Sequence, residues 1–225
     1  MPERIRRPVI GGFVPFSSVD WPGQLVAVVF MAGCPWRCHY CHNPHLQHRT
    51  GQYDWESILT FLRSRVGLLD GLVLSGGEPL TDPSCRDMIM QVRALGLKVA
   101  LHTAGIYPQR LAEVLPEVDW VGLDVKTNPR GYASLTGRPG SAEPVWHCLD
   151  LLLAWGGEFE CRTTWSTDWL PESELLDLAQ CLAQLGVRQY AVQQYRSCAS
   201  QRPTEHVGAN TLQILHRMFG KFSYR

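Results

Sequence analysis

The sequence predicts an α/β fold built on a parallel sheet, because strand-like and helical patterns alternate along the chain to give six βα units. The expected strands are continuously apolar, which is typical of parallel strands covered by helices on both faces. Six units are too few for a closed eight-unit barrel, so an open partial (β/α)6 barrel and a doubly wound sheet both fit. In either fold, ligands bind at the carboxyl ends of the strands.

Short apolar runs mark the expected strands. The first run is rich in β-branched residues, and the second ends in the turn sequence Ser75-Gly76-Gly77-Glu78-Pro79. The expected strands are 25–31, 71–74, 97–101, 120–125, 159–164 and 187–192.

The expected helices follow these strands, and their apolar residues recur at helical spacing. Pro116 ends one helix, and Pro171 lies in the first turn of another. The chain has no repeat and no low-complexity linker, so we expect a single domain over 1–225 with a lead-in over 1–23, a core over about 24–195 and a C-terminal helix over about 209–220. The expected helices are 55–66, 84–95, 107–115, 143–155, 171–185 and 210–219.

Composition excludes several classes of protein. Lys+Arg and Asp+Glu balance at 21 each, so no broad positive field indicates a nucleic-acid partner. No run approaches the roughly 20 apolar residues of a membrane span, and residues 1–20 lack the order of a signal peptide. We therefore expect a cytoplasmic protein, in which clustered cysteines more often bind metal than form disulfides.

Three cysteines in the loop after the first strand are the most informative feature. Cys34, Cys38 and Cys41 are spaced C-x3-C-x2-C, and three such thiolates can ligate three irons of a [4Fe–4S] cube and leave the fourth iron open. The other five cysteines are scattered singly and are interpreted as small buried hydrophobic residues. These five are Cys85, Cys148, Cys161, Cys181 and Cys198.

A zinc site is the alternative, because four histidines fall in the same region and tetrahedral zinc takes mixed Cys and His ligands. Zinc sites usually draw on two separate cysteine pairs, however, and here all three cysteines come from one loop. The even spacing of the histidines is more typical of a polar loop or helical turn. The histidines are His39, His42, His45 and His48.

Polar and charged side chains follow each of the six expected strands, which places them at the mouth where ligands bind. After the cysteine loop, the ends of the second to sixth strands carry Gly76-Gly77-Glu78, His102-Thr103, Asp124 and Lys126, Arg162 and Thr164, and Gln194-Tyr195-Arg196.

These motifs resemble the radical S-adenosylmethionine (SAM) superfamily: the cysteine motif with Tyr40 before its last cysteine, then Gly-Gly-Glu-Pro one strand later. Within it, three further elements are similar to the glycyl-radical-enzyme activases, above all the activating protein of anaerobic ribonucleoside-triphosphate reductase and then the pyruvate formate-lyase activating enzyme. The likeness runs from about residue 11 to about residue 195. The three elements are Ser17-Ser18-Val19-Asp20-Trp21-Pro22-Gly23, Tyr40-Cys41-His42-Asn43-Pro44 and Asp124-Val125-Lys126.

The resemblance implies an open partial (β/α)6 barrel, a [4Fe–4S] cluster and SAM. In such enzymes the open iron chelates SAM, and one electron from the cluster breaks a C–S bond to give a 5′-deoxyadenosyl radical. An activase uses that radical to take a hydrogen atom from a glycine Cα of a partner enzyme. The implied partners are a large glycyl-radical enzyme, foremost the anaerobic (class III) ribonucleotide reductase, and a low-potential electron donor such as flavodoxin or ferredoxin.

Residue roles implied by the resemblance follow the motifs. Cys34, Cys38 and Cys41 are the iron ligands and Tyr40 lies beside the adenine. Asp20 and Gly23 are candidates for contact with the partner's glycine loop. The remaining implied cofactor-binding residues are Gly76 and Gly77 near the SAM amino group, Glu78 orienting that loop, Thr103, Asp124 as a hydrogen-bond acceptor, and the cations Lys126 and Arg162.

Two departures from the lyase activases stand out. His102 fills a position where we expect an Asp that helps Thr103 and Asp124 to hold a monovalent cation, and an imidazole is a poor ligand for an alkali ion. Arg196 stands where those activases tend to carry a His, which favours the reductase type. The alternatives are a lyase activase, a small-molecule enzyme similar to the 7-carboxy-7-deazaguanine synthases, and a noncatalytic iron–sulfur or zinc module.

The tryptophans are interpreted mainly as core residues. Trp36, inside the cysteine loop, is expected to shield the cluster from water and oxygen. Trp165 and Trp169 are hypothesised to border the mouth where a partner loop enters. The expected core tryptophans are Trp55, Trp120, Trp146 and Trp155.

Overall fold

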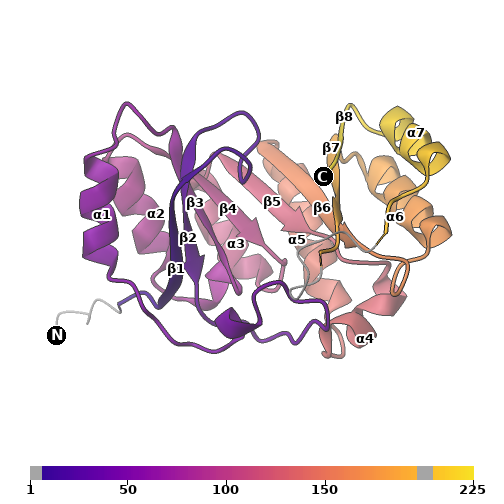
Figure 1. Cartoon of the computed structure of the whole chain (residues 1–225), viewed down its shortest axis with the longest axis horizontal. Helices are drawn as coiled ribbons and strands as arrows, with labels where there is room; N and C mark the ends of the chain where they lie inside the picture. Colours follow the sequence, from indigo (N-terminus) through magenta and orange to yellow (C-terminus); the bar gives the residue numbers. More distant parts are fainter. Residues whose placement is uncertain (1–6, 197–204) are drawn as a thin grey trace. The chain divides into compact units, whose positions relative to one another are not determined.

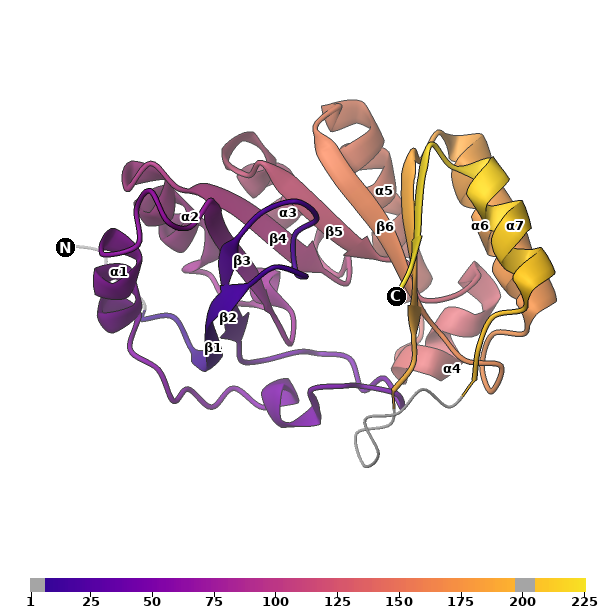
Figure 2. The same ribbon diagram turned by 45° about the horizontal axis from the view of Figure 1, so that its top comes forward.

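The computed structural model describes residues 7–196 and 205–225 (Figures 1 and 2). The chain forms two compact units. The first unit comprises the chain up to Pro35 together with Asn43–Val121, and the second comprises Trp36–His42 and the chain from Gly122 onward.

The strands of the described residues form one sheet in chain order, from β1 to β8. Strands β2, β3 and β4 pair in parallel, as do β6, β7 and β8, whereas β1 pairs antiparallel to β2. A doubly wound sheet reverses its strand order at a switch point, so the observed order confirms the open, mostly parallel alternative. The strands are β1 (Ile10–Ser17), β2 (Val26–Met31), β3 (Gly71–Gly76), β4 (Lys98–Thr103), β5 (Trp120–Asp124), β6 (Glu158–Trp165), β7 (Gln189–Gln194) and β8 (Lys221–Tyr224).

The helices of the first unit are α1 (Trp55–Arg63), α2 (Cys85–Ala94) and α3 (Pro108–Val114), and α1 and α2 lie side by side in both views. Helix α1 begins where the Asp54 carboxylate accepts a hydrogen bond of 2.9 Å from the Ser57 amide. This N-cap satisfies one of the amides that the first helical turn leaves without a partner. The buried face of α1 is spaced at helical intervals and consists of Trp55, Ile58, Leu59 and Leu62.

One face of the first unit's strands carries an apolar cluster. Its members alternate along the strands, as side chains on one face of a sheet must. Trp21, in the segment before β2, is 6% exposed and stacks on Trp120 with a centroid distance of 6.2 Å. The cluster consists of Trp21, Val26, Val28, Val73, Ala100 and Trp120, with Phe30 packed against it.

The helices of the second unit are α4 (Tyr132–Thr136), α5 (Ala142–Trp155), α6 (Glu172–Leu185) and α7 (Ala209–Met218). Helices α6 and α7 lie side by side in both views. The buried side of α6 follows the i, i+3, i+4, i+7 pattern that predicted this helix, and it consists of Leu175, Leu178, Ala179 and Leu182.

All six expected strands and all six expected helices are present, with ends shifted by a few residues. Within the expected lead-in, residues 10–17 form strand β1, which the sequence did not predict. Two glycines and Pro15 weaken the strand signal of that segment, and an edge strand tolerates them. Strand β8 and helix α4 were also not predicted, since four or five residues carry too little periodicity.

The interpretation of the scattered cysteines as buried residues is confirmed for Cys85, Cys148 and Cys161, which are at most 3% exposed. Cys181 is half-buried, and Cys198 lies outside the described residues. Among the core tryptophans, Trp55 and Trp120 are buried, whereas Trp146 and Trp155 are half-buried. None of the helices in the described ranges has the length and apolar character needed to cross a bilayer.

The turn after β3 requires two glycines for packing. Gly76 has a φ of +120°, and a Cβ there would meet the backbone of Met31 and Phe30. A Cβ on Gly77 would lie 2.6 Å from the Gly33 carbonyl oxygen and 2.8 Å from that of Leu46. Both glycines are therefore needed where this turn crosses the segment that follows β2.

We predict that Gly77→Ala lowers the free energy of unfolding by about 1–3 kcal/mol, because backbone atoms must move to admit the methyl group. Urea denaturation of the purified protein measures the change. Gly220→Ala is the matched control, since its Cβ would meet only the Arg188 carbonyl oxygen at 3.8 Å. Equal unfolding midpoints for the two variants would contradict the packing argument.

Candidate functional site

The cysteine loop is anchored on both of its sides. In the first unit, the Cys34 amide donates to the Gln47 carbonyl oxygen at 3.2 Å, directly after the end of β2. In the second unit, Trp36 is 3% exposed and packs edge-on against Tyr132 with a centroid distance of 6.2 Å. A turn closed by the Cys41 amide and the Cys38 carbonyl oxygen at 3.1 Å follows. The loop is thus held by backbone hydrogen bonds and by a buried indole.

The three cysteines of the motif are partly accessible thiols. Cys34 belongs to the first unit, and Cys38 and Cys41 belong to the second. Within residues 7–196 and 205–225, no three His, Cys, Asp or Glu side chains are arranged as a metal site, and this includes the four histidines considered for zinc. The assignment of the thiols as iron ligands therefore stays a prediction from their spacing.

In the first unit, Glu78 joins the turn after β3 to the end of β4. Its side chain is fully buried and accepts hydrogen bonds of 2.8 Å from the Thr103 hydroxyl, 2.8 Å from the Ala104 amide and 3.2 Å from the Leu80 amide. The Thr103 hydroxyl in turn accepts from the Gly105 amide at 3.0 Å. These donors compensate the buried carboxylate, so Glu78 and Thr103 position the two strand ends.

The second unit brings together the charged residues singled out at its strand ends. One carboxylate oxygen of Asp124 accepts from Arg162 Nη2 at 2.9 Å and Nε at 3.1 Å, and the other accepts from Lys126 Nζ at 3.3 Å. The Arg162 side chain is 7% exposed and that of Lys126 is 10% exposed. Two cations thus share one carboxylate, which leaves an excess of positive charge in a largely water-excluded place.

Electrostatics keep Lys126 charged. Burial, the largest single influence, works against its ammonium form. The pKa of Lys126 nevertheless lies well above its ordinary value, and the charged partner that opposes burial is the Asp124 carboxylate, 3.3 Å from Nζ. Burial raises the pKa of the Cys38 thiol, and the charge of Lys126 opposes that rise. Burial likewise raises the pKa of Tyr40, so its phenol stays protonated.

The second unit contains an aromatic cluster centred on Tyr40. Its members are Tyr40, Trp169, Tyr195, His39 and His42. Trp169 stacks on Tyr40 with centroids 4.7 Å apart and planes 10° apart, and His42 stacks on Tyr195 at 5.5 Å and 8°. Lys126 Nζ lies 5.7 Å from the centroid of the Tyr40 ring. These flat faces beside a cation suit a ligand that has both an aromatic ring and an anionic group.

Tyr40 also carries a polar atom that the described residues do not satisfy. Its side chain is buried, and Oη has no hydrogen-bond partner among them. Such an atom costs free energy unless a ligand or water completes it. In the second unit, the Tyr40 hydroxyl, the thiols of Cys38 and Cys41 and the two cations fit the donor and binding groups that a [4Fe–4S] cluster and SAM need.

Two residues change their interpretation. Trp165 is 1% exposed, so the hypothesis that it borders an entrance is wrong. Its indole fills the core of the second unit, whereas Trp169 is half-buried.

Tyr132 was not predicted as a site residue, yet its hydroxyl accepts from the Lys126 amide at 2.8 Å and fixes the backbone at the end of β5. No motif marks Tyr132, because its role depends on the folding of α4 toward that strand end.

A monovalent cation does not fit the residues expected to hold it. The Thr103 hydroxyl is bonded to Glu78 and Gly105, and both Asp124 oxygens are paired with cationic side chains. His102 Nε2 lies 2.8 Å from the Asp20 carbonyl oxygen, so it donates to that oxygen and offers no lone pair there. Each of the three side chains thus has partners within the protein, and the absence of a cation site stays a prediction.

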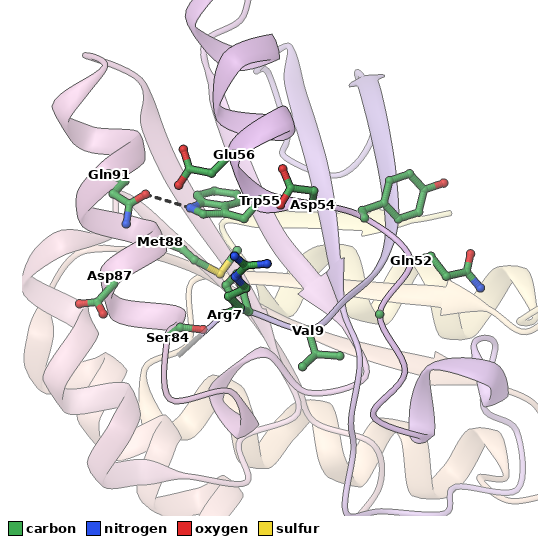
Figure 3. Close-up of a pocket in the computed structure, with 13 residues that line it drawn as sticks. Arg7, Val9, Gln52, Asp54, Trp55, Glu56, Ser84, Asp87, Met88 and Gln91 are labelled. Atoms are coloured by element: carbon green, nitrogen blue, oxygen red, sulfur yellow. Dashed lines mark hydrogen bonds between the residues drawn. The ribbon is translucent and has the colours of Figure 1, made fainter. Parts of the chain in front are cut away.

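A cavity of about 830 Å³ lies elsewhere in the first unit (Figure 3). It is lined by the chain around Val9, by residues 51–56 and by the first turns of α2, and a hydrogen bond of 2.9 Å from Trp55 Nε1 to Gln91 Oε1 spans part of it. None of the residues predicted from the motifs lines this cavity. Its wall combines apolar side chains with the charged side chains of Arg7, Asp54, Glu56 and Asp87, and it is separate from the predicted site residues.

Two kinds of relatives are similar to this chain in sequence. A protein of Methanocaldococcus jannaschii with the provisional name glycyl-radical enzyme activating enzyme is 28% identical over 198 residues, covering 83% of this chain and 80% of that protein. The pyruvate formate-lyase-activating enzyme of Clostridium pasteurianum is 35% identical over 128 residues, covering 53% of each protein. The chain thus spans about half the length of the lyase-activating enzymes that it matches.

Solved structures share the fold. Streptococcus suis SuiB gives a TM-score of 0.66 at 15% identity and covers 86% of this chain and 47% of that protein. A domain of the pyruvate-formate lyase-activating enzyme from Bacteroides vulgatus gives 0.59 at 19% identity and covers 69% of this chain and 98% of that domain. At these identities the likeness shows a common architecture.

The sequence also matches the Radical SAM superfamily over residues 28–167, which is well over half of the chain. That stretch contains the cysteine motif, the Gly-Gly-Glu-Pro turn, Asp124, Lys126 and Arg162. Enzymes of this superfamily work with a [4Fe–4S] cluster and SAM. The chain therefore belongs to the radical SAM superfamily.

Proposed function

We propose that this protein is a glycyl-radical-enzyme activase and that its partner is an anaerobic ribonucleotide reductase. One observation carries the site: Cys38 and Tyr40 of the cysteine loop lie beside Lys126, which is paired with Asp124 in a largely buried network with Arg162. Thiols for a cluster and cations for an anionic cofactor thus occur together in the second unit.

The proposed ligands of the cluster are Cys34, Cys38 and Cys41. When bound, the cluster and SAM supply the reductive cleavage that yields a 5′-deoxyadenosyl radical. Lys126 and Arg162 attract the SAM carboxylate, and because Asp124 holds both cations in place, little side-chain entropy is lost when that carboxylate binds. Tyr40 and Trp169, which stack on each other, form an aromatic wall beside which the adenine is proposed to lie, and the burial of Tyr40 helps to exclude water from the reacting region.

Apart from Cys34, the first unit is proposed to contribute backbone groups rather than charged side chains. The Gly76-Gly77 turn presents main-chain groups without side chains, and Glu78 fixes that turn through its three hydrogen bonds. We propose that this turn receives the SAM amino group. In this role Glu78 is a positioning residue, since its carboxylate is already engaged by the protein's own donors.

The choice of partner rests on sequence. Arg196, in place of the His of lyase activases, favours a reductase-type partner. A pyruvate formate-lyase-type partner is the second candidate, because several relatives carry that name. A low-potential donor such as flavodoxin or ferredoxin is proposed to supply the electron.

The deciding experiment uses anaerobically reconstituted protein that is reduced and supplied with SAM. Mass spectrometry measures 5′-deoxyadenosine and methionine, and electron paramagnetic resonance detects a glycyl radical on an added class III reductase or formate lyase. The proposal expects a radical on the reductase and product loss in Cys38→Ala. A radical on the lyase alone would transfer the function to the second candidate, and stoichiometric zinc without sulfide would reject both.

We predict that Tyr40→Phe weakens SAM binding without destabilising the protein. Removing the buried hydroxyl changes the stability of the cofactor-free protein little, because among the described residues it has no partner in good hydrogen-bond geometry and only its weak interaction with Lys126 is lost. The same variant weakens SAM binding roughly two- to tenfold if the cofactor completes that hydroxyl. Thermal denaturation and isothermal titration of cluster-loaded protein measure the two effects; Tyr53→Phe, at an exposed tyrosine, is the control.

We also predict that SAM cleavage does not depend on a monovalent cation. Replacing potassium and sodium by tetramethylammonium at constant ionic strength should leave the rate of 5′-deoxyadenosine formation within about twofold, since Lys126 and Arg162 already compensate Asp124. A steep and saturable activation by potassium would show that a cation displaces one of these pairs.

A further inference from the structure

We propose that His102 is a positioning residue that fixes the turn over residues 17–23, named the lead-in turn, and thereby controls how the protein engages an extended glycine-containing segment of its partner. The inference rests on the proposed function for its partner readout, whereas its structural readout does not. All of the contacts that support it lie within the first unit.

The central contact joins the end of β4 to the lead-in turn. His102 Nε2 lies 2.8 Å from the Asp20 carbonyl oxygen, and a carbonyl oxygen can only accept, so Nε2 carries the proton. The His102 side chain is 9% exposed, and its ring meets Trp120 with centroids 5.7 Å apart at 63°. A buried donor thus reaches across 82 positions of sequence to one main-chain atom of the turn.

The surroundings make this contact specific. His102 lies two residues beyond Ala100, so both point to the face that carries the apolar cluster. Trp21, the neighbour of Asp20, covers that cluster by stacking on Trp120. The turn is therefore held at two adjacent residues, by packing at Trp21 and by a hydrogen bond at Asp20.

The lead-in turn is also ordered by hydrogen bonds within itself. The Ser17 hydroxyl donates to the Asp20 carboxylate at 2.5 Å and accepts from the Val19 amide at 3.2 Å. The other end is closed by the Gln24 amide and the Trp21 carbonyl oxygen at 3.1 Å. These bonds order the turn internally, so its direction is set by its two anchors, the packing of Trp21 and the hydrogen bond from His102.

This direction decides what the turn presents. Val19 is 75% exposed, and the half-buried Asp20 beside it carries a carboxylate that accepts from the Ser17 hydroxyl. A carboxylate of this kind can accept from the backbone amides of an extended chain, and glycine allows the closest backbone approach. A rotated turn would move both groups, which would weaken partner binding while leaving the SAM residues in place.

The chemistry at position 102 predicts a graded series. The side-chain amide nitrogen of glutamine lies about as far from Cα as Nε2 of histidine and can still donate a hydrogen bond. Leucine has a similar volume but no donor. We expect His102→Leu to accelerate amide hydrogen exchange in residues 18–24 by about three- to tenfold, the range for one lost hydrogen bond. We expect a similar increase in the KM for the partner, with kcat and partner-free SAM cleavage within about twofold.

The experiment compares His102→Leu, His102→Gln and the exposed-site control His147→Leu in cluster-loaded protein, by hydrogen exchange and by activation kinetics. Faster exchange and a raised partner KM in His102→Leu alone support the inference. Unchanged exchange, or an equal loss of SAM cleavage and partner activation, overturns it. If the wild type cleaves SAM but activates no partner, the proposed function fails, while hydrogen exchange still decides whether His102 holds the turn.

Discussion

Compensation of buried charge at the strand ends is the constraint on which the rest of the structure depends. A parallel sheet places its ligand-binding side chains where the strands end, and those positions are partly closed to water. Each charged group there must therefore find partners of its own. In the first unit, Glu78 takes one hydroxyl and two amides; in the second, Asp124 takes one guanidinium and one ammonium.

The two units solve this problem with different results. The Thr103 hydroxyl and the Leu80 and Ala104 amides, which are neutral donors, hold the Glu78 carboxylate in place. Asp124 is shared by two cations, so the second unit retains positive charge. The first arrangement is suited to holding a main-chain turn, and the second is suited to attracting an anionic group. This difference supports the proposed roles, in which the Gly76-Gly77 turn receives the SAM amino group and the cations receive the SAM carboxylate.

The sequence was sufficient for the repeating part of the fold. Strands such as β2 and helices such as α6 are long and periodic, and hydrophobic spacing identifies them without other information. Strand β1 was not predicted, because its glycines and Pro15 weaken the strand pattern and the segment becomes a strand only by pairing with β2. The role of Tyr132 could not be predicted for a similar reason, since its hydrogen bond to the Lys126 backbone forms only after α4 has folded.

The motif glycines show why a sequence pattern can identify a family and still leave its physical cause open. The resemblance assigns Gly76 and Gly77 to close approach of a cofactor. The structure adds a requirement, because a side chain at either position would meet the protein's own backbone at Met31 or Gly33. Substituting these glycines would therefore change stability and binding together. Glu78 offers a cleaner separation, since its hydrogen bonds position the turn without contributing a side chain to its surface, and His102 holds the lead-in turn by the same physical means.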